Sequence, residues 1–253
     1  MKVICLIPAR MGSSRFPGKP LKNIKGLPMI EHVYKRTRLS KTVNKVAVAT
    51  PDKEISDFVK SFGGNVIMTS PSHERASDRC AEALLIEEKK DNLIYDIVVM
   101  VQGDEPLVHP RMIDDAVNEI QNDINIKVVN LLGNLTEEEY KNKNIIKVIV
   151  NKKNDAIYFS RISIPYSKKL DLSLVGKQIC VIPFRRDFLL DYSNLKPSPL
   201  EIAESIDMLR VLEYGYDVRM TPCELVSHPV DVEEDIIRVE KLLDKDEIYQ
   251  KGY

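Results

Sequence analysis

The first half of this sequence alternates between unbroken apolar runs and longer stretches with the periodicity of amphipathic helices. The apolar runs predict buried strands at 3–9, 45–50, 65–69 and 96–102. Helical patterns fall between and after them, at 28–39, 52–62, 77–90 and 110–121. Such alternation indicates βαβ units and therefore an α/β fold, with a mainly parallel mixed sheet and helices on both faces. Ligands of such sheets bind beyond the carboxyl ends of the strands. Chemistry is therefore expected just after Ala9, Thr50, Thr69 and Gln102.

The second half is less regular. Strands are expected at 126–132, 145–151, 156–160, 176–184 and near Val218. Helices are expected at 186–192, 199–214 and 232–243. We expect these strands to extend the first sheet, with one antiparallel excursion. Residues 244–253 are charged and are expected to fray.

The charge balance limits the kinds of partner. The 253 residues are 43% hydrophobic and 30% charged, which is typical of a soluble globular protein, and the net charge is −1. Such a surface is not drawn as a whole to nucleic acid or to an anionic membrane, so neither is an expected partner. Any anion site must be a local cluster of Arg and Lys.

The cysteines and the apolar runs point to a reducing compartment. The four cysteines are widely spaced and form no C-x-x-C pair, which argues against a zinc site and a disulfide framework. The run at 3–9 is too short for a signal peptide, and no stretch is long enough to span a membrane. A cytoplasmic location is therefore expected.

A loop rich in cations follows the first predicted strand. It contains the cations Arg10, Arg15 and Lys19, the hydroxyls Ser13 and Ser14, and Gly12 and Gly18. A glycine lets the backbone approach a ligand closely, and successive N–H groups can cradle an anion. The cations add charge-assisted hydrogen bonds to phosphate oxygens. The loop has neither Walker A spacing nor a G-x-G-x-x-G pattern. The alternative is a solvated basic loop that binds nothing.

Two carboxylates are candidate metal ligands. Asp104 lies just past the fourth strand, beside Gly103, where a carboxylate suits the hard cation of a metal–triphosphate complex. Asp231 precedes the last predicted helix and is interpreted either as a second metal ligand or as the N-cap of that helix. For Asp104 the alternative is a simple Asp-Glu-Pro turn.

Other polar residues are weaker candidates. Ser77 is expected to cap the helix that follows the third strand, and Arg79, one turn later, to point at the ligand crevice. Lys147, Arg161 and Glu204 form a further set in the second half. Each of these alone is as well explained as surface charge.

Six segments, in order along nearly the whole chain, resemble motifs of the 3-deoxy-manno-octulosonate (Kdo) cytidylyltransferases, the CMP-Kdo synthetases. They are residues 7–21, 101–106, 157–165, 197–201, 209–215 and 230–235. The resemblance implies a nucleotide-diphosphosugar-transferase-like fold and a homodimer. It also implies a Mg²⁺-dependent reaction of CTP with an acidic sugar that yields the CMP-sugar and pyrophosphate. The chain would be one domain, with a nucleotide-binding half of about 1–125 and an acceptor-binding and dimerisation half of about 126–253.

The resemblance also implies residue roles. The nucleotide would be held by Arg10, Gly12, Ser13, Arg15, Lys19, Arg75, Ala76, Ser77 and Gln102. The catalytic residues would be Arg15, Lys19, Asp104 and Asp231, and the last two would bind magnesium. The small acidic acceptor would face Arg79, Arg161, Gln178 and Glu204, and also Gln102.

The sequence departs from the family mainly on the acceptor side. A Ser-Gly-Thr run of the family reads Arg75-Ala76-Ser77 here, and a Lys-His-Leu-Gly segment reads Lys177-Gln178-Ile179-Cys180. A Tyr-x-Tyr pattern reads Ile182-Pro183-Phe184, and a Gln is replaced by Met208. Each lost polar partner leaves a sugar group unpaired, at about 1–3 kcal/mol. The alternatives are therefore a different acidic acceptor, such as amino-Kdo, another sugar acid or a phosphorylated or phosphonate metabolite, and a non-catalytic nucleotide-binding protein.

Overall fold

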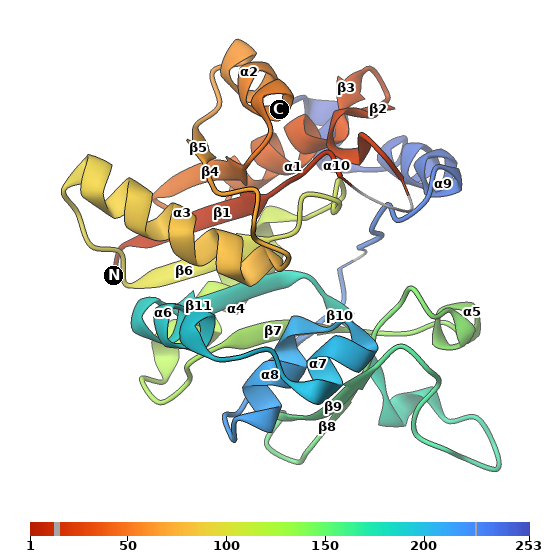
Figure 1. The fold of residues 1–253 in the computed structure, drawn as a ribbon. Coiled ribbons are helices and arrows are strands. Elements are labelled where there is room, and N and C mark those ends of the chain that lie inside the picture. Colours follow the sequence, from red (N-terminus) through yellow and green to blue (C-terminus); the bar gives the residue numbers. More distant parts are fainter. Residues whose placement is uncertain (13–15, 226) are drawn as a thin grey trace.

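The computed structural model describes residues 1–12, 16–225 and 227–253, which form two five-stranded sheets and a small two-stranded ribbon, with helices packed around them (Figure 1). The first sheet has the order β11-β6-β1-β4-β5. Its strands are β1 (Val3–Pro8), β4 (Lys45–Thr50), β5 (Val66–Met68), β6 (Ile97–Val101) and β11 (Val181–Arg185). The first four are parallel and β11 is antiparallel to β6. The predicted α/β fold with a mainly parallel mixed sheet is confirmed.

Strand β1 is buried on both faces because helices cover both sides of the first sheet. Ile4 and Leu6 pack with α3 (Ala76–Asp91) and α6 (Arg186–Asn194). Val3, Cys5 and Ile7 pack on the opposite side. The helices on that side are α1 (Met29–Arg38), α2 (Lys53–Ser61) and α4 (Pro110–Asn122). An unbroken apolar run is what such two-sided burial requires.

Five strands of the second half form a separate sheet, so the prediction that they extend the first one was wrong for these five and right for β11, which pairs antiparallel with β6. The order is β12-β7-β10-β8-β9. The strands are β7 (Val129–Gly133), β8 (Lys147–Val150), β9 (Ala156–Ser160), β10 (Gly176–Ile179) and β12 (Arg219–Cys223). The apolar run at 176–184, predicted as one strand, divides at Cys180: β10 pairs with β7 and β8, and β11 pairs with β6. One stretch of chain therefore serves both sheets.

The helices of the second half also differ from the prediction. The single helix expected at 199–214 is two helices, α7 (Pro199–Glu204) and α8 (Asp207–Glu213), because Ser205 adopts a positive φ of 54° that ends α7. Short elements complete the chain. They are η1 (Lys19–Leu21), β2 (Asn23–Ile24), β3 (Leu27–Pro28), α5 (Glu137–Lys141), η2 (Leu172–Leu174) and α9 (Glu234–Leu243).

The C-terminal residues are anchored rather than frayed. They form α10 (Glu247–Lys251), which lies near α1 (Figure 1). The Arg36 guanidinium is fully buried and donates to the Asp246 carboxylate at 2.8 and 3.0 Å. Tyr253 contributes a hydroxyl contact to His32. The expectation of fraying was wrong because Asp246 forms an ion pair with the buried Arg36 and so holds the C-terminal segment against the protein.

Among the described residues, no helix combines the length and the apolarity needed to cross a lipid bilayer.

Candidate active site

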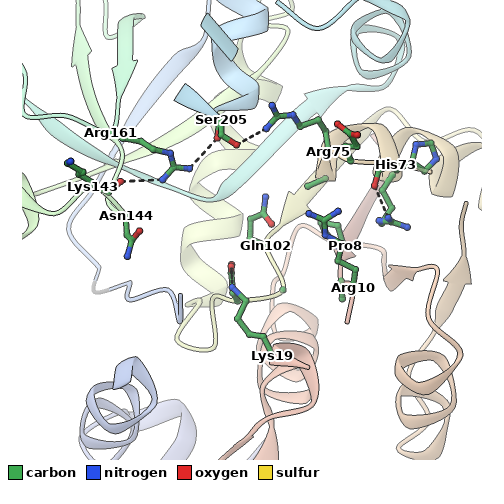
Figure 2. A pocket seen from close by; sticks show the side chains of 16 residues that line it. Pro8, Arg10, Lys19, His73, Arg75, Gln102, Lys143, Asn144, Arg161 and Ser205 are labelled. Atoms are coloured by element: carbon green, nitrogen blue, oxygen red, sulfur yellow. Dashed lines mark hydrogen bonds and ion pairs between the residues drawn. The ribbon is translucent and has the colours of Figure 1, made fainter. Parts of the chain in front are cut away.

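Two adjoining pockets, of about 610 and 210 Å³, open at the carboxyl ends of β1 and β6, between the two sheets. Figure 2 shows the larger of these two. Arg10 and Lys19 line only the larger pocket, and Gln178 and Asp231 line only the smaller one. The residues that line both pockets are Gln102, Asp104, Asn144, Arg161 and Ser205. The pockets therefore open at two of the four strand ends where chemistry was predicted, after Ala9 and Gln102. Gln102 lies between Arg161 on one side and Arg10 on the other (Figure 2).

Lys19 joins the two segments that carry the candidate metal ligands. Its Nζ donates to Asp104 Oδ2 at 2.6 Å and to the Val230 carbonyl at 2.9 Å. The Val230 N–H in turn donates to the Asp104 carbonyl at 2.9 Å. Asp231 follows directly, and both carboxylates line the smaller pocket. The Lys19 ammonium and this backbone bond thus hold Asp104 and Val230 side by side, although they are more than 120 residues apart in the sequence.

The carboxylates of Asp104 and Asp231 are the kind of ligand that magnesium prefers. Burial raises the pKa of Glu105 to about 7, and the negative charges of Asp104 and Asp231 add to the rise. Asp104 and Asp231 both line the smaller pocket, and Lys19 offsets part of the charge of Asp104. No group of three or more candidate ligands occurs in the described part of the chain. Two carboxylates suffice for Mg²⁺, which completes its shell with phosphate oxygens and water.

Two predicted helix caps are absent. Helix α9 begins at Glu234 with Glu233 as its N-cap, so the interpretation of Asp231 as the cap was wrong. Helix α3 begins after Arg75, and the Ser77 hydroxyl donates to Asp207 Oδ2 at 2.8 Å instead of capping. Ser77 is fully buried and ties α3 to the start of α8.

The cation-rich loop after β1 is held by a residue that follows the neighbouring strand β4. The Met11 N–H donates to Asp52 Oδ2 at 2.7 Å, just past β4. Arg10 lines the larger pocket, whereas Gly12 is exposed and a Cβ at Gly12 would meet nothing within 4 Å. The predicted ligands Ser13 and Arg15 lie outside the described residues.

Arg75 bridges the two halves of the chain across the larger pocket. It lies 3.3 Å from Glu201 Oε1 through Nε, and its Nη1 donates to Ser205 Oγ at 3.1 Å. Asp207 Oδ1 lies 3.7 Å from Nη1. The charge of Arg75 is thus offset by protein carboxylates. Ala76 also lines this pocket.

Arg79 supports the wall of the larger pocket from within. The residue is 3% exposed, and burial lowers its pKa. Its guanidinium donates to Thr69 Oγ1 at 2.6 Å and to the carbonyls of Ser70 and His73 at 3.1 and 3.2 Å. These bonds fix the loop after β5, while Arg79 still lines the pocket.

The predicted acceptor residues divide into a lining set and a supporting residue. Arg161 lines both pockets, and Gln178 lines the smaller one while its Nε2 donates to Asn130 Oδ1 at 2.6 Å. Glu204 is absent from the described linings of both pockets. Its carboxylate accepts from Ser160 Oγ at 2.6 Å and from the Arg161 N–H at 2.9 Å, behind Arg161.

The family departures fall only partly on the pocket. Gln178 and Ile182 line the smaller pocket. Phe184 and Met208 are fully buried in the core between the sheet and its helices. Pro183 pairs with Val99 inside the first sheet. Several of the changes therefore alter core packing rather than the acceptor surface.

Some pocket residues were missed by the sequence analysis. Lys143 and Asn144 lie on the turn before β8, and Ser205 lies at the junction of α7 and α8. No local motif marks them, because their place depends on how the second sheet packs against the first.

Gly103 is expected to tolerate no side chain. A Cβ there would lie 2.9 Å from the Pro8 carbonyl, so the turn that carries Asp104 must shift. Gly103→Ala should lower the free energy of unfolding by about 1–3 kcal/mol, measured by urea denaturation. Gly12→Ala, in open space, is the matched control and should leave stability unchanged. Equal stability of the two variants would contradict this packing argument.

Comparison with known proteins identifies the family. A family model described as cytidylyltransferase matches residues 4–224. The 3-deoxy-manno-octulosonate cytidylyltransferase of Geobacter metallireducens is 38% identical, with 98% of this chain and 100% of the relative covered. The enzyme of the same name from Syntrophotalea carbinolica is 41% identical, with 95% and 98% covered.

A solved structure agrees with these relatives. The CMP:2-keto-3-deoxy-manno-octonic acid synthetase complexed with CTP has a TM-score of 0.87 and 36% identity, and the match covers 97% of this chain and 99% of that one. The resemblance seen in the sequence motifs is thus confirmed over the full length and in the fold. The chain belongs to the 3-deoxy-manno-octulosonate cytidylyltransferase family and is a nucleotidyltransferase.

Proposed function

We propose that the protein transfers a cytidylyl group from CTP to Kdo, giving CMP-Kdo and pyrophosphate, with Mg²⁺ as cofactor. The observation that carries the proposal is the Lys19 bridge, which brings Asp104 and the Asp231 segment together where the two pockets meet. The CTP complex of the related synthetase and the names of the full-length relatives support the choice of substrates.

The reaction needs positioning more than covalent chemistry from the protein. An acceptor hydroxyl oxygen attacks the α-phosphorus as the bond to pyrophosphate breaks, and the hydroxyl proton is lost. Magnesium, held by Asp104 and Asp231, would supply neutralisation of the charge that develops on the phosphates. Lys19, with its flexible stem and three N–H groups, would stabilise the departing pyrophosphate, together with Arg15.

The pockets suggest how the substrates divide. We assign the larger pocket to CTP, with Arg10, Gly12, Ser13, Arg75, Ala76 and Gln102 around the nucleotide. Ser77 acts from behind, through Asp207. We assign the acceptor to the junction with the smaller pocket, where Arg161 offers a planar cation for a carboxylate and Gln178 an amide. Arg79 and Glu204 position these walls rather than contact the sugar.

A second copy of the chain is the proposed partner. Apolar side chains are exposed along the excursion between β9 and β10, including Tyr166, which is 90% exposed, and Ile162, Leu170 and Leu174. These residues lie in the half assigned to dimerisation. Light scattering should give twice the mass of one chain, and the mass of a single chain would contradict the dimer.

Pyrophosphate release from CTP tests the proposed function. With Mg²⁺ and Kdo the protein should release pyrophosphate and form CMP-Kdo, and chelation of the metal should stop the reaction. ATP, GTP and UTP serve as controls for the nucleotide. Release with another sugar acid but not with Kdo would support the altered acceptor. CTP binding without release for any acceptor would support a non-catalytic protein.

A further inference from the structure

We propose that Lys147 is a positioning residue that holds the acceptor-side wall of both pockets in place through three backbone carbonyls. The inference rests on the proposed function, because that function assigns this wall to the acceptor.

The ammonium group of Lys147 is fully occupied by the protein. Lys147 is the first residue of β8, opposite Ser160 of β9, and is completely buried. Its Nζ donates to the carbonyls of Asn142, Ile145 and Arg161, at 2.8, 2.7 and 2.5 Å. A lysine ammonium has three N–H donors and no acceptor. All three are used, so Lys147 acts through the backbone and does not reach a ligand.

The three carbonyls belong to the segments that form the wall. The 142–145 turn places Lys143 and Asn144 in the larger pocket. Arg161 lines both pockets and is fixed from the other side, since its Nε donates to the Glu204 carbonyl at 2.7 Å and its Nη2 to the Ser205 carbonyl at 3.2 Å. Figure 2 shows the Arg161 guanidinium between Lys143 and Ser205. Arg161 Nη1 also donates to the Lys143 carbonyl at 3.4 Å, so Lys147 adds three shorter bonds that join the backbone of the turn to the backbone of Arg161.

Within the described part of the chain, this buried cation donates to backbone carbonyls and to no carboxylate. Burial and the positive charge of Arg161 together lower the pKa of Lys147 to about 8, and Glu204 partly opposes this shift. Lys177, opposite Lys147 on β10, is itself paired with Glu139. Above about pH 8 the neutral amine keeps only two N–H groups, so one wall carbonyl loses its donor.

Protonation of Lys147 should strengthen acceptor binding. The protonated form holds all three carbonyls and favours a bound anion beside Arg161. Acceptor binding and protonation of Lys147 therefore promote each other. The KM for Kdo should rise as the pH increases from about 7 to about 9, while the KM for CTP stays constant over that range.

The decisive comparison is Lys147→Met against Lys152→Met, which removes an exposed lysine from the turn after β8. Initial rates are measured with CTP and Kdo across this pH range. Lys147→Met should raise the KM for Kdo about tenfold, the cost of an unpaired buried carbonyl. Its KM for CTP should change less than about twofold, as for a surface substitution, and its KM for Kdo should lose the pH dependence. Lys152→Met should behave as the unchanged protein.

Three outcomes would overturn the inference. One is an unchanged KM for Kdo in Lys147→Met. Another is an equal change in kcat and in both KM values, which indicates general loosening. If Lys147→Met does not fold, a KM for Kdo in the unchanged protein that is flat with pH decides against it. An unchanged protein that releases no pyrophosphate with Kdo instead overturns the proposed function, and this inference with it.

Discussion

Asp104→Asn is expected to lower kcat with CTP and Kdo by about 10³-fold, because the substitution keeps the shape of the side chain but removes the charge that we propose holds the metal. Asp231→Asn should cause a similar loss. The double variant should be little worse than either single one, since residues that act as a unit are not additive. Rates measured over a Mg²⁺ titration check this result.

The aspartate result needs two controls. Asp187→Asn changes an aspartate whose side chain is 86% exposed, and should leave the rate unchanged. Urea denaturation of each variant separates catalysis from folding. If Asp231→Asn lowers only the free energy of unfolding, Asp231 supports the segment after Val230 and is not a metal ligand.

Arg210→Met is expected to lower the free energy of unfolding by about 3 kcal/mol, because it leaves the buried Glu201 carboxylate with the longer 3.3 Å contact to Arg75 in place of its pair with Arg210. The Arg210 and Glu201 side chains are 1% and 0% exposed and form a two-point pair at 2.7 and 2.6 Å. The carboxylate of Glu201 also raises the pKa of Arg210, although burial opposes this.

A double-mutant cycle tests this ion pair. Glu201→Met with Arg210→Met removes both charges and should recover much of the lost stability. Lys141→Met breaks an exposed pair with Glu137 and should cost less than about 1 kcal/mol. A double variant as unstable as the sum of the single ones would contradict the argument.

The first half of the fold was predictable because its signals are local. Strands β1, β4 and β6 are unbroken apolar runs. Their parallel direction follows from the helices that connect them. The place of the site follows as well, because ligands of such sheets bind at the carboxyl ends of the strands. Arg10, Lys19 and Asp104 lie there as expected.

The second half was less predictable because tertiary contacts, rather than local sequence signals, set where its strands and helices end. The run at 176–184 carries no break that marks Cys180, yet its ends pair with different sheets. Ser205 stands in a helical pattern, and only its positive φ in the packed structure separates α7 from α8. Glu204 reads as a site residue by motif, but its carboxylate faces Ser160 and the Arg161 backbone.

The crossing at Cys180 limits how this enzyme is able to move. The Cys180 carbonyl accepts from the Gln102 N–H at 3.2 Å, directly beside the site. Only one residue separates β10 from β11. The two sheets therefore cannot move apart at this point without breaking strand pairing in one of them. Adaptation to substrates must then come from the rim, through the segments around Arg75, Asn144 and Ser205.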